Sequence, residues 1–185
     1  MSPLLVYRTA AESMTFTYAA IAGWLVAHAV MELRQYPLSG LGAGPAPDLW
    51  FGYTPDRLNG YYGEIGEGGC RLYVRLANWD LFPYMFLYSG LLGSVLVRVA
   101  RRTGRSDAIA HLVSATLLSD MVETAVQREG CRIFPSRRLD DRLVAAGSWG
   151  NRIKWILLAA SALAIPWMLI DRRSGKRKRA NRRQR

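Results

Sequence analysis

Ionisable side chains stand inside apolar stretches of this 185-residue sequence, and they are the side chains that could do chemistry. His28 and Glu32 are four residues apart, so a helix places both on one face. Another apolar stretch carries polar residues every three or four positions, at Thr116, Asp120, Glu123 and Gln127. Imidazoles and carboxylates held beside a bound molecule can give and take protons. His28, Glu32, Asp120 and Glu123 are therefore candidate acid/base groups.

Other polar residues in these stretches could pair with the candidate groups. Asp80 and Tyr84 lie one turn apart, while Arg152 and Lys154 stand at the start of the last apolar stretch. Charges at membrane depth are costly, so we expect these side chains to face one another inside the protein. Two interpretations remain open. One is a structural network in which Arg152, Lys154 or Arg128 pairs with the carboxylates, and the other is a lipid-facing active site.

The sequence contains no glycine-rich phosphate loop, no HExxH motif and no metal-binding set of Cys and His. Its two histidines, His28 and His111, are expected toward opposite faces of a membrane, which disfavours a haem held by both. We therefore expect no metal and no cofactor other than a bound phospholipid.

The two cysteines occur in similar phrases, Gly69-Cys70-Arg71 and Gly130-Cys131-Arg132. Both precede or follow an apolar stretch on the side of the membrane away from the chain termini. If that side is oxidising, a disulfide between Cys70 and Cys131 is feasible. The alternative is two unpaired thiols, and the sequence leaves both open.

Four apolar stretches dominate the sequence, at about residues 16–33, 79–100, 106–126 and 153–170. Each has about the 20 residues that an α-helix needs to cross the hydrocarbon core. The stretches at 16–33 and 106–126 carry ionisable residues and could also be buried helices of a soluble protein, but the other two commit the chain to the bilayer. We therefore predict an all-α integral membrane bundle of about four transmembrane helices over residues 1–171.

The segment 35–75 is too long for a plain connection, so we expect short interfacial helices in it. Thr54 and Pro55 are typical of a helix start, and Gly66, Gly68 and Gly69 are expected to break that helix. Proline in the first turn of a helix does no harm, which suits Pro83. Pro166 lies deeper in its stretch and should bend the last helix.

Residues 172–185 form a basic tail that holds nine of the 25 Lys and Arg residues and no acid. Removing these nine charges from the net charge of +11 leaves +2 for residues 1–171. The tail has too little apolar surface to order itself, and it suits anionic lipid headgroups or acidic surfaces of other membrane-protein subunits. Nucleic acid is not expected, because no aromatic residues interleave with the charges. The proposed contact residues are Arg172, Arg173, Lys176, Arg177, Lys178 and Arg179.

An even number of spans places both termini on one side of the membrane. That side carries the tail together with Arg8, Arg98, Arg101, Arg102 and Arg105. Basic residues favour the cytoplasmic side, or the matrix side in an organelle. We therefore expect the termini in the cytoplasm or in the mitochondrial matrix.

Residues 51–86 resemble a pattern found in a family of small four-helix integral membrane proteins of unassigned function. The residues that carry this resemblance are Gly52, Tyr53, Thr54, Pro55, Tyr62, Gly63, Gly66, Arg71, Tyr73, Asp80, Phe82 and Pro83. The acidic pair in SDMVET and the Lys-Trp of RIKWILL fit the rest of the pattern. The resemblance implies the four-helix architecture and no known chemistry.

Two main hypotheses for the function follow. The first is an accessory, structural subunit of a large membrane complex, such as a respiratory-chain or ATP synthase assembly of the mitochondrial inner membrane. The second is a small membrane enzyme or lipid-binding protein, since the spacing of His28 and Glu32 is similar to that in the emopamil-binding sterol isomerases. A transporter is a third hypothesis, which the lack of visible inverted repeats disfavours.

Overall fold

The computed structural model describes residues 2–183, and their side chains except those of Tyr36, Ser39 and the residues after Asp171. The helices are α1 (Pro3–Glu12), α2 (Met14–Ser39), α3 (Pro55–Trp79), α4 (Met85–Thr103), α5 (His111–Ile133) and α6 (Asp141–Arg183). Short helical segments lie between them, namely η1 (Pro47–Leu49), η2 (Asp80–Tyr84) and η3 (Asp107–Ala110). No strand occurs within residues 2–183, so the predicted all-α class is confirmed.

Four stretches of helix are long and apolar enough to cross a membrane: Met14–Gln35, Pro55–Thr103, Asp107–Ile133 and Asp141–Asp171. The predicted number of spans is confirmed, although each observed helix is longer than its apolar stretch. Large apolar side chains point outward along these helices, and Val26, Leu118 and Leu163 are 64%, 64% and 69% exposed. Such a surface is stable in lipid, and the protein is therefore an integral membrane protein.

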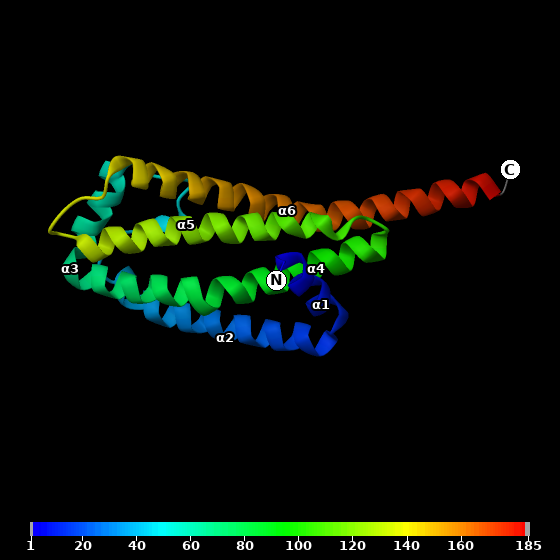
Figure 1. Ribbon diagram of the computed structural model, residues 1–185, viewed down its shortest axis with the longest axis horizontal. Coiled ribbons are helices and arrows are strands. Elements are labelled where there is room, and N and C mark those ends of the chain that lie inside the picture. Colours follow the sequence, from blue (N-terminus) through cyan, green and yellow to red (C-terminus); the bar gives the residue numbers. More distant parts are fainter. Residues whose placement is uncertain (1, 184–185) are drawn as a thin grey trace.

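The helices form an elongated bundle in which α2 packs on α4, α4 packs on α5 and α6, and α5 packs on α6 (Figure 1). In that view α2 and α6 lie at opposite edges of the bundle. The turn after α4 and the start of α2 lie at one end, while α3 and the connection from α5 to α6 lie at the other. Polar residues of α2, α4, α5 and α6 can therefore meet in the space between α2 and α6.

The helices α5 and α6 approach each other closely at Gly150. A Cβ atom on this residue would stand only 2.8 Å from the backbone oxygen of Ser119 and 3.3 Å from the backbone nitrogen of Glu123. Small residues permit such contacts between membrane helices, where packing rather than water drives association. This contact sets the distance between the two helices that carry most of the buried charges.

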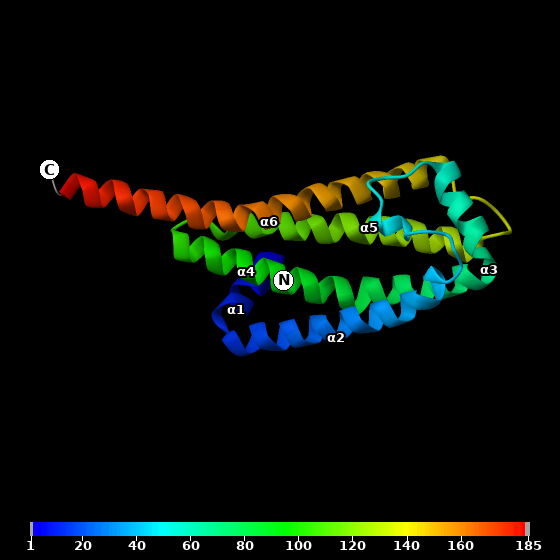
Figure 2. The same cartoon turned by 180° about the vertical axis from the view of Figure 1, so that it is seen from behind.

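The connection between α2 and α3 folds back along α5 and α6 (Figure 2). The backbone N–H of Gly52 donates to Asn151 Oδ1 at 3.2 Å, and that of Tyr53 donates to Ser148 Oγ at 2.9 Å. A short helical segment that the sequence did not predict, η1, also lies in this connection. Its backbone carbonyl groups accept hydrogen bonds from the buried residues Asn151 and Lys154 of α6.

The predicted start of α3 is confirmed, because Thr54 caps the helix by accepting from the Arg57 N–H at 3.3 Å and Pro55 follows it. The predicted break occurs at Gly66 alone, where φ is 63°. The prediction was wrong for Gly68 and Gly69, because the helix resumes directly after the kink. Its second half then continues into the membrane span.

The placement of Pro83 in a first helical turn was also wrong. Pro83 lies inside η2, a π-helical segment that joins α3 to α4, next to Phe82 in an extended conformation. Pro166 does lie inside α6. That helix changes direction in its orange part, near residues 160–170 by the colour bar (Figure 1), as a proline within a helix predicts.

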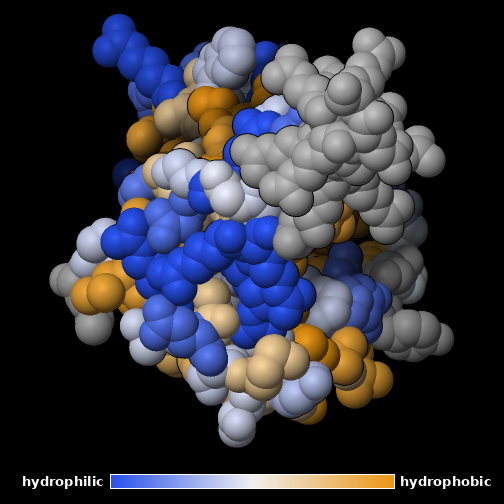
Figure 3. Space-filling model, turned by 90° about the vertical axis from the view of Figure 1, so that its right-hand side faces the viewer, coloured by the Kyte–Doolittle hydropathy of each residue, from blue (hydrophilic) through white to orange (hydrophobic). Residues whose placement is uncertain are grey.

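Hydrophilic residues cover much of the end of the bundle at which α4 turns into α5, with apolar residues around them (Figure 3). Helix α1, which the sequence did not predict, is held against this end by Arg8, whose guanidinium forms two 2.8 Å hydrogen bonds with Asp107. Arg101 also pairs with Glu12 at 3.0 Å. These contacts fix α1 against the turn between α4 and α5.

Helix α6 continues beyond this end as far as Arg183 (Figure 1). The basic tail thus extends a helix, whereas its composition alone predicts no ordered structure. Lys and Arg have high helix propensity, and adding residues to a formed helix avoids the cost of nucleation. The side chains of Arg172, Arg173, Lys176 and of residues 177–179 lie outside the described ones, so their proposed contacts stay predictions.

Candidate functional site

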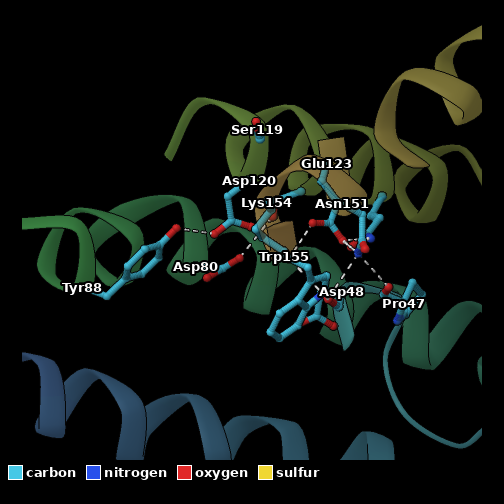
Figure 4. A network of polar contacts seen from close by, with 12 residues as sticks. Pro47, Asp48, Asp80, Tyr88, Ser119, Asp120, Glu123, Asn151, Lys154 and Trp155 are labelled. Atoms are coloured by element: carbon cyan, nitrogen blue, oxygen red, sulfur yellow. Dashed lines mark hydrogen bonds and ion pairs between the residues drawn. The ribbon is translucent and has the colours of Figure 1, made fainter. Parts of the chain in front are cut away.

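A buried ion-pair cluster joins α5 and α6 (Figure 4). Lys154 Nζ lies 3.3 Å from Asp120 Oδ1 and 2.5 Å from Glu123 Oε2. The three residues are only 6%, 6% and 0% exposed, respectively. An ammonium shared by two carboxylates offsets part of the cost of burying all three charges. The sequence predicted that these residues would meet, and the structure brings them together.

Asn151 stands three residues before Lys154 on α6 and is fully buried. Its side-chain amide donates to Glu123 Oε1 and to the carbonyl oxygens of Pro47 and Asp48, the latter two at 3.3 and 3.2 Å. The ammonium of Lys154 also donates to the Asp48 carbonyl, at 3.3 Å. These bonds hold η1 against the cluster, so the loop between α2 and α3 forms part of the site.

A hydrogen-bonded chain extends the cluster toward α3. The Gln127 amide donates to Glu123 Oε1 at 2.8 Å, and the Tyr73 hydroxyl donates to Gln127 Oε1 at 2.5 Å. Tyr62 donates its hydroxyl to the Gln127 carbonyl at 3.0 Å. The four residues of the predicted polar stripe on α5, Thr116, Asp120, Glu123 and Gln127, are all buried, which confirms that the stripe faces inward.

On the opposite side of the cluster, two carboxylates meet hydroxyl groups. The Tyr88 hydroxyl donates to Asp120 Oδ2 at 2.7 Å, and the Thr124 hydroxyl donates to Asp80 Oδ2 at 3.1 Å. Asp80 forms no ion pair with any described side chain. The Asp80 carboxylate therefore bonds to the neutral Thr124 hydroxyl, whereas the Asp120 carboxylate also pairs with the Lys154 ammonium.

A cavity of about 390 Å³ opens beside these groups, and we name it the α2/α6 groove. Its apolar walls come from α4 and α6, and aromatic rings from α2, η2, α4 and α6 surround its polar end. The lining residues are Trp24, Asp48, Leu49, Asp80, Tyr84, Tyr88, Leu91, Leu92, Asp120, Lys154, Trp155 and Leu158. A cavity with apolar walls and a charged end fits an amphipathic molecule.

His28 and Glu32 line a second cavity of about 320 Å³, which shares Asp48, Asp80 and Tyr84 with the groove. His28 Nε2 lies 3.9 Å from Glu32 Oε1, and His28 Nδ1 lies 3.4 Å from the Tyr84 hydroxyl. No hydrogen bond or ion pair among the described residues joins this pair to Asp120 or Glu123. The four candidate acid/base groups therefore form two separate pairs that flank the groove.

Arg152 does not take part in the ion-pair cluster. Its guanidinium lies over the ring of Trp149, 5.0 Å from the centroid, and against the backbone of Gly52. The side chain stands on a different face of α6 from Lys154, because two residues along a helix correspond to a rotation of about 200°. The predicted network thus contains Lys154 and excludes Arg152.

Burial raises the pKa of the Asp48 carboxyl above its ordinary value of 3.8, and the nearby Lys154 ammonium offsets this only in part. Asp48 lies in η1, between the membrane-spanning stretches, and lines the groove. Its carboxyl group is therefore a poorly solvated acid at the polar end of the cavity.

Cys70 and Cys131 are both free and buried, in one hydrophobic cluster with Tyr61, Tyr62 and Tyr73. The structure thus favours two unpaired thiols. Among residues 2–171, no three His, Cys, Asp or Glu side chains are grouped in a way that could hold a metal ion.

Sequence reasoning missed Asp48 and Asn151 as parts of the site. Asn151 could have been found, since it precedes Lys154 by one turn on the same face of a helix. Nothing in the sequence around Asp48 predicts that its loop folds back into the bundle. Tyr88 was not missed, because it continues the four-residue spacing of Asp80 and Tyr84 and is expected to line up with them on one helix.

Comparison of the chain with protein-family models, with curated proteins and with solved structures finds no match. A function can therefore be inferred only from the geometry of the cluster and the groove.

Proposed function

We propose that this protein binds an amphipathic molecule of the bilayer, with the molecule's polar end at the ion-pair cluster and its apolar part along the α2/α6 groove. The observation that carries this proposal is the single cavity of about 390 Å³ that joins apolar walls to a charged end. Volumes of about 300–1,000 Å³ are usual for sites that bind small molecules.

A binding role fits the contacts of the cluster better than acid/base catalysis does. Asp120 and Glu123 are both engaged by Lys154, and Asp120 also accepts from Tyr88. A general acid or base needs its proton-accepting atom within hydrogen-bond reach of the substrate. Here all four carboxylate oxygens of Asp120 and Glu123 already have partners, which orient these groups for recognition.

Filling the groove tests this proposal. The variant Leu91→Trp adds a large side chain to the groove wall, and we expect it to retain less lipid than the natural chain after purification in mild detergent. The matched control is Leu118→Trp, because Leu118 is 64% exposed on α5 outside the groove. Native mass spectrometry of both variants measures the retained lipid. Equal retention by the two variants would refute the groove as the binding site.

A second candidate function, that of an accessory subunit in a large membrane complex, is favoured by α6. This helix runs from Asp141 to Arg183, well past the end of its membrane span at Asp171. The extension carries nearly all of the nine basic residues of the tail. A charged helix that projects from a bundle can bind acidic surfaces of a neighbouring subunit through bidentate arginine contacts.

Truncation after Asp171 tests this second candidate. We expect the truncated chain to insert in the membrane but to be lost from any larger assembly on native gels. A full-length control with glutamine at each Lys and Arg of residues 172–185 separates charge from length. If both variants migrate with the same partners as the natural chain, the tail does not bind a subunit.

The location proposed for such a subunit is the mitochondrial inner membrane, with the termini on the matrix side; in a bacterial membrane they would face the cytoplasm. Support for this orientation comes from the basic residues at the end of the bundle that carries the termini, among them Arg8, Arg98 and Arg101. Positive residues are enriched on that side of membranes.

A further inference from the structure

Carboxylates outnumber basic side chains at the polar end of the groove. Asp48, Asp80 and Asp120 line it, and Glu123 pairs with Lys154 of the lining at 2.5 Å. The one basic residue in the lining is Lys154. With every group ionised, the site would carry four negative charges and one positive charge, which is an unstable balance at membrane depth.

Lys154 cannot balance the whole site, because its ammonium is already engaged. It pairs with Asp120 and Glu123 and donates to the Asp48 carbonyl. The next basic group along the helix, Arg152, lies over Trp149 on a different face. Neither Asp48 nor Asp80 forms an ion pair with a described side chain, so these two acids leave room for an external positive charge.

Aromatic rings complete the polar end of the groove. Trp24, Tyr84, Tyr88 and Trp155 all line it. The rings of Tyr84 and Tyr88 are adjacent, with centroids 5.9 Å apart, and Lys154 Nζ already lies 5.5 Å from the Trp155 ring centroid. Ring faces carry negative electrostatic potential and attract ammonium groups, including quaternary ones.

We propose that the groove selects amphiphiles whose polar end carries a positively charged nitrogen, held between Asp80, Asp48 and the rings of Tyr84 and Tyr88. The apolar chain of such a molecule would lie along Leu91, Leu92 and Leu158. This inference rests on the proposed binding function of the groove and names its ligand class. An anionic headgroup is disfavoured, because it would approach several carboxylates and meet only an ammonium that is already paired.

The test is a competition measured by native mass spectrometry on the full chain in a non-ionic detergent. The probes are sphingosine, phosphatidylethanolamine, diacylglycerol and phosphatidic acid at equal concentrations. We expect the two probes with an ammonium group to bind about tenfold more tightly than diacylglycerol, a ratio that corresponds to about 1.4 kcal/mol. Phosphatidic acid should bind most weakly.

The variant Asp80→Asn is expected to reduce this ratio to near unity while diacylglycerol still binds. Asp48→Asn is a second variant with the same expected effect, in case Asp80→Asn fails to fold. The matched control is Asp56→Asn, because the Asp56 side chain is 95% exposed and lies outside the groove. It should leave the ratio unchanged.

The outcomes separate this inference from the function on which it rests. If Leu91→Trp does not weaken binding of any probe, the groove itself fails as a site. If Leu91→Trp weakens binding but diacylglycerol or phosphatidic acid binds best, the groove stands and the cationic ligand is refuted. Binding of sphingosine alone would identify a free long-chain amine, and binding of phosphatidylethanolamine alone would identify a lipid headgroup.

Discussion

At the scale of single residues, the stability of the buried carboxylates depends on Lys154. This ammonium lies within 3.3 Å of Asp120 and 2.5 Å of Glu123, and all three residues are nearly inaccessible. Removing one partner of a buried ion pair leaves the other charge without compensation, which costs more than the pair contributes. Replacing the whole set by neutral residues avoids this cost.

We therefore predict that Lys154→Met lowers the free energy of unfolding by about 3–5 kcal/mol, whereas the triple variant Lys154→Met, Asp120→Asn, Glu123→Gln recovers most of it. Thermal unfolding in detergent, followed by size-exclusion chromatography, measures both effects. Arg152→Met is the control, because Arg152 lies on the same helix but outside the cluster. A triple variant no more stable than Lys154→Met would show that the residues stabilise the fold by some means other than charge pairing.

The burial of the Asp48 carboxyl predicts that the stability of the protein depends on pH. The pKa of this carboxyl in the folded protein is raised by burial, so its contribution to stability is fully present at pH below 3.8 and is lost as the pH rises through the raised value. Asp48→Asn should therefore raise the melting temperature at pH 7. The gain should shrink as the pH approaches 4. A melting temperature lowered by Asp48→Asn at pH 7 would mean that the carboxylate is stabilised by a partner.

The composition of the cluster could be predicted in part from residue types. The spacing on α5 predicted the inward stripe, and the cost of intramembrane charge predicted that Lys154 would face it. The prediction that Arg152 belongs to the network was wrong. Arg152 and Lys154 are close in sequence, and this proximity alone did not show which of the two points inward. Asp48 could not be predicted, since its position depends on tertiary hydrogen bonds to Asn151 and Lys154 rather than on local sequence.

At the scale of helices, the geometry of the site depends on how closely α5 and α6 pack. Gly150 allows the backbone of α6 to touch α5 at Ser119 and Glu123. Lys154 stands one turn farther along, so the same contact sets the distance between its ammonium and the two carboxylates.

We predict that Gly150→Ala separates the helices and weakens the cluster, because its new Cβ atom would stand 2.8 Å from a backbone oxygen that cannot easily move. The melting temperature should fall, and lipid retention should fall with it. The matched control is Gly90→Ala on α4, where no atom lies within 4 Å of the added Cβ. Gly90→Ala should be neutral or stabilising by about 0.4–1 kcal/mol. Similar losses in both variants would exclude the close contact as the cause.

The helices themselves were largely predictable, because lipid requires long apolar segments whose backbone groups bond within the segment. The residues at which the helices begin and end were harder to predict. The span after Trp79 is continuous with α3 through η2, a continuity across Pro83 that no local sequence pattern predicts. Helix α1 was missed for a different reason. It is held by ion pairs from Arg8 and Arg101 to residues far along the chain.

At the scale of the whole molecule, the two ends of the bundle differ in charge. The end at which α4 turns into α5 is joined by ion pairs of Arg8, Arg101 and Arg105 and leads into the extension of α6, while α3 and the connection from α5 to α6 lie at the other end (Figure 1). Arg105 contacts Asp171 and lies 4.6 Å from the ring centroid of Trp167, which fastens the end of the membrane-spanning part of α6 to the turn after α4. This asymmetry fixes how the bundle should sit in a membrane.

We predict that cysteines placed at Ser2 and Ser136, in a chain with Cys70→Ala and Cys131→Ala, are labelled from opposite sides of the membrane. Ser2 is exposed before α1, which Arg8 holds against the turn between α4 and α5, and Ser136 is exposed in the connection between α5 and α6 at the other end. Basic residues are retained on the cytoplasmic or matrix side, so a membrane-impermeant maleimide should reach Ser2→Cys from that side and Ser136→Cys from the other. Detergent-permeabilised vesicles, in which both positions should react, serve as the control. Labelling of both positions from one side would contradict the four-span arrangement, and labelling with the sides exchanged would contradict only the orientation.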